Sequence, residues 1–164
     1  MKTAVYPGSF DPITLGHLNI IKRSAVCFDK LVVCVMVNAE KDRGLFTPDE
    51  RVELIRRVVS RLSNVEVDHS SGLLSDYCRQ RKACTIIKGL RAVSDYEKEV
   101  QMAMVNRKLN PRLETMLLPS SAKYTYLSSS VVKELAFYGA DLSDFVPREI
   151  IDDINEKVKH RRDG

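Results

Sequence analysis

A nearly continuous run of aliphatic residues, KLVVCVMV at residues 30–37, most constrains how this chain can fold. A strand with one face in water alternates apolar and polar side chains, whereas a strand buried on both faces is apolar throughout. Strands of the second kind belong to parallel sheets, in which helices connect successive strands and cover both faces. The run therefore predicts a buried strand of a parallel sheet.

Strands and helices alternate along the rest of the chain. Apolar runs predict further strands at 2–5, 64–68, 84–88 and 114–118, and apolar residues three and four apart predict helices at 18–28, from 47, at 72–82, 93–108 and 128–139, and from 147. In the helix at 93–108 we expect a buried face of Tyr96, Val100, Ala103 and Met104. With 164 residues, this alternation predicts an α/β fold, namely a single-domain doubly wound Rossmann-like fold with a five-stranded parallel sheet. The helix from about 147 should end in a fraying basic tail.

Composition narrows the class of protein. No apolar run approaches the roughly 20 residues that span a bilayer, and no long apolar secretory core is present near the start, so we expect a cytoplasmic protein with no membrane partner. The net charge of +4 suits anionic ligands. Aromatic residues make up only 7% and tryptophan is missing, which argues against a nucleic-acid-binding module. Four cysteines (Cys27, Cys34, Cys78 and Cys84) form no C-x-x-C pair, so we expect reduced thiols and no zinc site.

The segment YPGSFDPITLGH, residues 6–17, joins the first predicted strand to the first predicted helix. The first N–H groups of a helix have no partner within it, and that end is partly positive, so such a junction can bind phosphate. Gly8 would let the backbone approach a ligand, Ser9 offers a hydroxyl, and His17 can donate a hydrogen bond to a phosphate oxygen. Taken alone, Pro-Gly and Asp-Pro are also ordinary turn dipeptides.

Other polar residues follow the remaining predicted strands. His17, Lys41, residues 88–91 and residues 124–130 all come after strand ends. In doubly wound folds ligands bind beyond the carboxyl ends of the strands, where the strand order switches. We therefore expect these residues to converge on one site.

The same segment resembles the signature of the HxGH/TxGH nucleotidyltransferases in its T-x-G-H form, and more closely the family of bacterial phosphopantetheine adenylyltransferases. The resemblance covers essentially the whole chain, so residues 1–164 would form a single nucleotidyltransferase domain. It implies transfer of the adenylyl group of ATP to 4'-phosphopantetheine, giving dephospho-coenzyme A and pyrophosphate in coenzyme A biosynthesis. It also implies a homohexamer, Mg²⁺ as cofactor and feedback inhibition by coenzyme A.

The resemblance also implies which residues act. Catalytic roles fall to His17, Lys41 and Arg91. The ATP-binding positions are Ser9, Phe10, His17, Gly89, Leu90, Arg91, Glu99, Tyr124, Thr125, Tyr126, Leu127, Ser128, Ser129 and Ser130. The acceptor-binding positions are Ser9, Lys41, Leu74 and Lys88. We expect no metal-binding side chains, because phosphates and water would hold Mg²⁺.

Lys88 departs from the family pattern. The family more often has R-G-L-R, whereas this chain has K-G-L-R. Lysine keeps the positive charge, but it lacks the bidentate hydrogen bonding of arginine to phosphate. Acceptor-phosphate binding is therefore expected to survive with a different geometry.

Four alternatives remain open at this stage. A sister nucleotidyltransferase could act on nicotinate mononucleotide or a polyol phosphate, and a class I tRNA synthetase fragment shares the general motif. A basic nucleic-acid-binding module belongs to a different class of protein. A nucleotide sensor without catalysis would keep the ATP site and lose turnover.

Overall fold

The structure, a computed structural model, describes residues 1–37 and 44–163. Strands and helices alternate as the sequence predicts. In chain order the elements are β1 (Thr3–Gly8), α1 (Leu15–Ala25), β2 (Lys30–Met36), α2 (Pro48–Val59), β3 (Val65–Ser70), α3 (Leu74–Gln80), β4 (Thr85–Leu90), α4 (Val93–Leu109), β5 (Glu114–Pro119), the 3-10 turn η1 (Ala122–Tyr124), α5 (Ser129–Phe137), the 3-10 turn η2 (Arg148–Ile150) and α6 (Ile151–Asp163).

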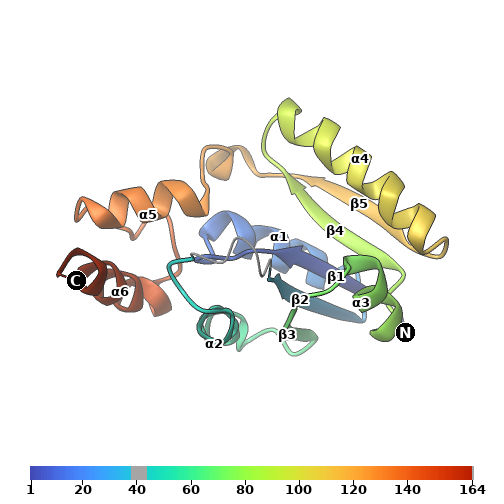
Figure 1. The fold of residues 1–164 in the computed structure, drawn as a ribbon, viewed down its shortest axis with the longest axis horizontal. Helices are drawn as coiled ribbons and strands as arrows, with labels where there is room; N and C mark the ends of the chain where they lie inside the picture. The colour runs from blue at the N-terminus through green and yellow to red at the C-terminus, as the bar shows by residue number, and fades with distance from the viewer. Residues whose placement is uncertain (38–43, 164) are drawn as a thin grey trace.

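The five strands form one parallel sheet in the order β3-β2-β1-β4-β5, which confirms the predicted fold class (Figure 1). The chain moves outward from β1 to β3 and then returns to the other side of β1 to add β4 and β5. β1 pairs with β2 along its whole length, from Thr3 to Gly8. With β4 it pairs only at Ala4 and Val5, so the two strands separate toward their carboxyl ends. The switch in strand order thus coincides with an opening in the sheet.

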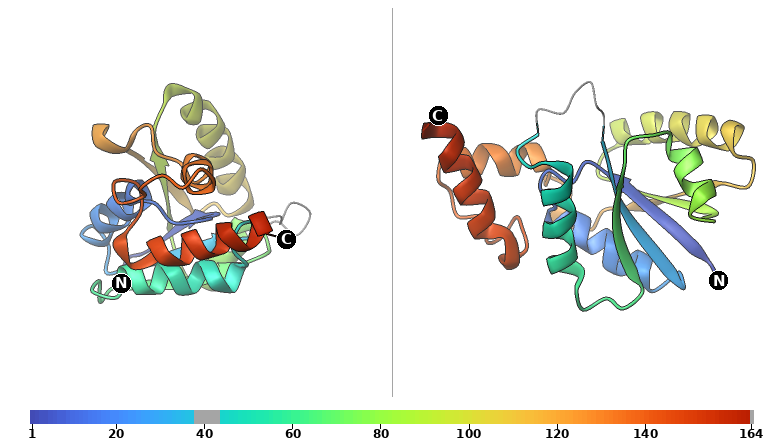
Figure 2. Two further views of the ribbon diagram at one scale, coloured as in Figure 1. Left: turned by 90° about the vertical axis from the view of Figure 1, so that its left-hand side faces the viewer. Right: turned by 60° about the horizontal axis from the view of Figure 1, so that its bottom comes forward.

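Helices cover both faces of the sheet, as its apolar central strands require. Ala4 and Tyr6 point into a large core shared with α1, α2, α5 and α6, whereas Val5 points into a smaller core shared with α3. Figures 1 and 2 accordingly show α3 and α4 on the opposite face from α1 and α2. α5 and α6 lie beyond the carboxyl ends of the strands (Figure 1).

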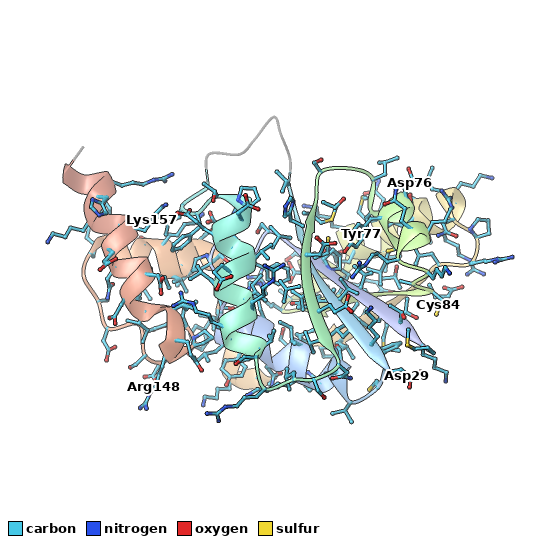
Figure 3. The ribbon with its side chains drawn as sticks, turned by 90° about the horizontal axis from the view of Figure 1, so that it is seen from below. Asp29, Asp76, Tyr77, Cys84, Arg148 and Lys157 are labelled. Carbon is cyan, nitrogen blue, oxygen red and sulfur yellow. The ribbon has the colours of Figure 1, made fainter. Side chains whose placement is uncertain are left out.

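The last helix packs along α2. Lys157 Nζ lies 2.5 Å from Glu50 Oε1, and Arg57 pairs with Asp153 at 2.7 Å. Figure 3 labels Lys157 on α6, beside α2. The start of α2 is the predicted capping box: the Thr47 hydroxyl accepts from the Glu50 N–H, and the Glu50 carboxylate accepts from the Thr47 N–H.

β1 and β4 extend further than predicted. β1 continues to Gly8 and β4 to Leu90, so Gly89 lies within a strand rather than after it. Proline and glycine are depleted in strands, so Pro7, Gly8 and Gly89 made both strands seem to end too early in the sequence.

The predicted buried face of α4 is wrong for two of its four residues. Tyr96 and Met104 are 52% and 69% exposed, whereas Val100 and Ala103 are half-buried. Helical periodicity identifies an apolar stripe but not the surface that covers it, and the described residues cover only part of this stripe. Among the described residues, no helix is both long enough and apolar enough to cross a membrane.

Candidate active site

A cleft of about 300 Å³ opens where β1 and β4 separate. Most of the predicted site residues line it, and they come from both strands and from the segments beyond them: Ser9, His17, Lys88, Gly89, Arg91, Glu99, Tyr124, Leu127, Ser128, Ser129 and Ser130. Six further residues line it without having been assigned a role: Tyr6, Pro7, Thr14, Gly16, Asp95 and Ser120. The structure therefore brings together residues that are more than a hundred positions apart in sequence.

The T-x-G-H sequence forms the start of α1. Thr14 is the N-cap in an extended conformation, and its hydroxyl accepts a hydrogen bond from the His17 N–H at 3.3 Å. In return, the Thr14 N–H donates to His17 Nδ1 at 3.1 Å. This is a capping box in which histidine replaces the usual Glu or Gln. Because Nδ1 accepts, Nε2 carries the ring proton, and His17 offers the cleft an N–H donor.

The imidazole of His17 stays neutral. Burial is the main cause and the positive charge of Arg91 the second, and together they lower the pKa of His17 from its ordinary value of 6.5 to about 4. A neutral ring with a fixed tautomer is a hydrogen-bond donor rather than a cation. The sequence could place His17 in the first helical turn but could not determine its protonation state.

Phe10 packs against His17. Its ring lies 5.0 Å from the imidazole, centroid to centroid, in an edge-to-face arrangement. Phe10 adopts φ 45°, which is uncommon for a residue other than glycine, and it is 1% exposed. A Cβ at Gly8 would lie 2.9 Å from this ring. Gly8 therefore makes room for Phe10, and close approach of its backbone to a ligand stays a prediction.

Two cations flank the cleft, and a carboxylate holds each of them. Lys88 Nζ lies 3.1 Å from Glu99 Oε2. Arg91 Nε lies 3.6 Å from Asp95 Oδ2, and its terminal nitrogen donates to the Leu127 carbonyl at 3.1 Å. Asp95 Oδ2 also accepts from the Arg91 N–H, so this acid fixes both the backbone and the side chain of Arg91. The position of Asp95 near the start of the predicted helix at 93–108 was the sequence feature that could have indicated this role.

The N-terminus of α5 forms the wall opposite the sheet. Ser128 is the N-cap, and its hydroxyl accepts from the Val131 N–H at 3.2 Å. The Ser129 hydroxyl donates to the Pro12 carbonyl at 2.8 Å, which ties α5 to the segment between β1 and α1. The first N–H groups of α5, at Ser129 and Ser130, lack partners within the helix and are available to an anion.

The other assigned residues that the structure describes do not line the cleft. Phe10 lies beneath His17, and Leu90, Thr125 and Tyr126 lie next to lining residues in sequence. Leu74 packs against the smaller core from α3, so contact with an acceptor stays a prediction. Lys41 falls outside the residues that the structure describes.

The cleft suits a ligand with several phosphates. It presents an imidazole N–H, two cations, five serines and a helix N-terminus within one cavity. Its two acids already balance Lys88 and Arg91. Within residues 1–37 and 44–163, no group of three His, Cys, Asp or Glu side chains could hold a metal ion. The arrangement fits charge stabilisation at phosphorus better than activation of a protein nucleophile.

Comparisons with known proteins agree with this chemistry. The family model described as cytidylyltransferase-like matches residues 5–135. A phosphopantetheine adenylyltransferase of Clostridium botulinum strain Hall is 57% identical over 163 residues, covering 99% of each chain. One from Caldanaerobacter subterraneus subsp. tengcongensis is 55% identical over 159 residues, covering 97% of this chain and 99% of the relative.

Solved structures agree on the fold. A candidate nicotinate-nucleotide adenylyltransferase of Vibrio parahaemolyticus superposes with a TM-score of 0.70, covering 96% of this chain and 95% of the other. The two sequences are 19% identical, so the likeness shows a shared architecture and nothing about the acceptor.

Proposed function

The chain belongs to the cytidylyltransferase-like family and, within it, to the phosphopantetheine adenylyltransferases, and from this membership we propose how the cleft divides the reaction among its residues. The enzyme transfers the adenylyl group of ATP to 4'-phosphopantetheine and releases dephospho-coenzyme A and pyrophosphate. We propose that residues 1–164 act as a single nucleotidyltransferase domain, because Ile154 and Val158 of α6 share one core with β1.

The reaction joins an oxygen of the acceptor phosphate to the α-phosphorus of ATP and breaks the bond from that phosphorus to the bridging oxygen of pyrophosphate. The acceptor phosphate is already an anion with free lone pairs, so no protein base has to remove a proton from it. The enzyme must instead hold two anions in line and stabilise the charge that develops at the α-phosphate. Fixed donors and cations are the groups for this task.

His17 would donate to the α-phosphate. Its Nδ1 is occupied by the Thr14 N–H, which leaves Nε2–H for the cleft. Its lowered pKa keeps it a neutral donor across the physiological range. This capped and neutral imidazole, which lines the same cleft as Lys88 and Arg91, is the observation that carries the proposal.

The ATP phosphates would lie between Arg91 and the start of α5. Arg91 is held by Asp95 and the Leu127 carbonyl, so its remaining donors can face the ligand. Ser129 and Ser130 contribute backbone N–H groups. Tyr124 and Leu127 would line the nucleoside side, with Glu99 nearby. Phe10, Gly89, Leu90, Thr125, Tyr126 and Ser128 complete the proposed ATP site.

The acceptor phosphate would lie against Ser9 and Lys88, with Lys41 as a third donor and Leu74 beside the pantetheine arm. Lys88 contacts Glu99 in the free cleft, so an incoming phosphate must share or replace this partner. A lysine offers a single charged centre, whereas an arginine could contact the carboxylate and the phosphate together.

Mg²⁺ would enter with ATP. Because the carboxylates of Asp95 and Glu99 are committed to cations, phosphate oxygens and water are the better ligands in this cleft. The ion would offset the charge of the triphosphate and of the departing pyrophosphate.

Kinetics can test the assignment of Lys88 to the acceptor and of Arg91 to ATP. We expect Lys88→Met to raise the KM for 4'-phosphopantetheine at least tenfold with little change in the KM for ATP. Arg91→Met should raise the KM for ATP and lower kcat. Lys88→Arg should remain active, because arginine keeps the charge and can donate to a phosphate from two nitrogens.

Arg112→Met, at an exposed position between α4 and β5, is the control and should match the parent enzyme. Equal effects of Lys88→Met on both KM values would contradict the assignment.

Assembly, regulation and location follow from the same membership. We propose a homohexamer in which the apolar side chains that α4 exposes meet another subunit. We propose that coenzyme A inhibits by feedback, since it combines the nucleotide and pantetheine parts that this cleft binds separately. We also propose a cytoplasmic location, where ATP is available and where the four unpaired thiols would stay reduced.

A further inference from the structure

Asp11 is a buried acid that lies beside the cleft without lining it. It is 5% exposed and follows β1 in the segment that leads to α1. Its Oδ2 accepts the Leu45 N–H and its Oδ1 the Phe46 N–H, each at 2.8 Å. Lys133 Nζ lies 3.2 Å from Oδ2, and Arg51 Nε lies 3.4 Å from Oδ1. One carboxylate thus holds two backbone amides and two cations.

Arg51 extends the same cluster. It is 4% exposed, its Nε donates to the Phe46 carbonyl at 2.8 Å, and a terminal nitrogen donates to the Ser9 carbonyl at 3.4 Å. A Cβ at Gly44 would lie 1.8 Å from the other terminal nitrogen of Arg51. Any side chain at position 44 would therefore have to displace the guanidinium.

The cluster joins three parts of the chain, two of which contribute residues to the cleft. Asp11 lies two residues after Ser9 in the segment between β1 and α1, Leu45 and Phe46 lead into α2, and Lys133 lies on α5. The hydrogen bond from Ser129 to the Pro12 carbonyl is a second tie between α5 and the first part.

A buried ion cluster of this kind needs an explanation beyond stability. Removing charges from water is expensive, and well-packed apolar side chains often stabilise a protein as much or more. An ion cluster does fix geometry, because each carboxylate oxygen accepts only along defined directions. In a reaction that depends on aligning two anions, an error of about 1 Å can cost roughly a hundredfold in rate.

We propose that Asp11, with Arg51 and Lys133, is a positioning residue that fixes the Ser9 segment and the start of α5 in one geometry around the reacting phosphates and anchors both to the entry of α2. The proposal rests on the proposed function, because it assumes that the Ser9 segment and the start of α5 meet the substrates. Asp11 itself does not line the cleft and acts through the residues that it holds.

The direct test is Asp11→Asn, which keeps the size and removes the charge. We expect a folded enzyme with kcat lowered at least tenfold and with both KM values within about threefold of the parent. All rates are compared at a temperature at which each variant is fully folded. In amide exchange, Leu45 and Phe46 should lose protection, because an amide NH₂ would replace one of their acceptors.

Asn64→Ala is the matched control, and it lies near the amino ends of the strands rather than near the cleft. The Asn64 amide donates to the Ala25 and Phe28 carbonyls at 2.7 and 3.0 Å, near the ends of the strands where Figure 3 labels Asp29 and Cys84. This variant should lower Tm and leave kcat unchanged. An equal loss of kcat at an equal loss of Tm would show that Asp11 contributes only stability, and the proposal would be wrong.

Lys133→Met keeps the test decisive if Asp11→Asn does not fold. The Lys133 side chain is 38% exposed, so its loss should be tolerated, and we expect kcat to fall three- to tenfold. Unchanged kcat in a folded Lys133→Met, or in a folded Asp11→Asn, overturns the proposal. ATP binding by the parent enzyme is measured separately by calorimetry. A parent enzyme that does not bind ATP, or an Arg91→Met variant with unchanged kinetics, would contradict the proposed function rather than the role of Asp11.

Discussion

At the scale of single residues, His17 has two tasks, one for each ring nitrogen. Nδ1 completes the capping box of α1 with the Thr14 N–H, and Nε2–H faces the cleft. The same side chain therefore starts the helix and supplies the donor. A substitution has to be chosen so that these two tasks are separated.

His17→Ala should lower kcat by two or more orders of magnitude and change ATP affinity much less, because the lost hydrogen bond matters most in the transition state. It should also cost about 1 kcal/mol of stability through the lost cap. His17→Gln separates the two effects: glutamine is an ordinary capping-box partner, so it should regain stability without regaining the rate. Near-normal turnover in either variant would remove His17 from its assigned role.

The lowered pKa of His17 also predicts how stability depends on pH. The folded pKa is about 4 and the ordinary value is 6.5, so between these values the unfolded chain binds a proton that the folded chain does not. The stability contributed by neutral His17 is complete above pH 6.5 and is lost as the pH falls toward 4. Between pH 7.5 and pH 5 this amounts to at most about 2 kcal/mol.

Urea unfolding at these two pH values checks this prediction. His17→Gln removes the titrating group, so its stability should fall less than that of the parent between pH 7.5 and pH 5. Parallel losses in the two proteins would mean that His17 titrates normally in the folded state.

At the scale of elements, the start of α5 joins helix capping to anion binding. Ser128→Ala removes the N-cap hydroxyl, which should cost about 1 kcal/mol of stability and raise the KM for ATP several-fold, because the first N–H groups of α5 would be less well ordered. Thr47→Ala removes the corresponding cap of α2, away from the cleft. It should cost similar stability and leave the KM for ATP unchanged. A KM that rises equally in both variants would reduce the α5 effect to general destabilisation.

The elements also show where prediction from sequence succeeds. The T-x-G-H cap and the Thr47 capping box were predictable because their hydrogen bonds join residues three apart. The Asp11 cluster was not, because its partners lie 34 to 122 residues away and only the folded chain brings them together. Asp95 had a visible signal in its place near the start of a predicted helix, but its contact with Arg91 depends on the side-chain geometry.

At the scale of the whole molecule, α4 carries apolar side chains that the chain itself leaves in water. They are Val93, Tyr96, Met102, Met104, Val105 and Leu109. The sequence predicted part of this stripe as core, and the physical reason for the error is that periodicity cannot distinguish burial within a chain from burial between chains. The proposed homohexamer gives these residues a covering surface.

Met104→Lys tests this proposal. A charge at a position that is 69% exposed in the single chain should not unfold it, but it should oppose an apolar contact between subunits. We expect light scattering to report a smaller assembly than that of the parent. Lys123→Met, at an exposed position outside α4, should leave the assembly unchanged. A parent enzyme that is monomeric at micromolar concentration would contradict the proposal directly.

The central claim is the transfer of an adenylyl group to one particular acceptor by the cleft between β1 and β4. The most direct measurement is pyrophosphate release from ATP and Mg²⁺ with 4'-phosphopantetheine and, in parallel, with nicotinate mononucleotide. Release with 4'-phosphopantetheine alone, lost in His17→Ala, is the predicted result. Release with nicotinate mononucleotide alone, or none with either acceptor despite measurable ATP binding, would contradict the account.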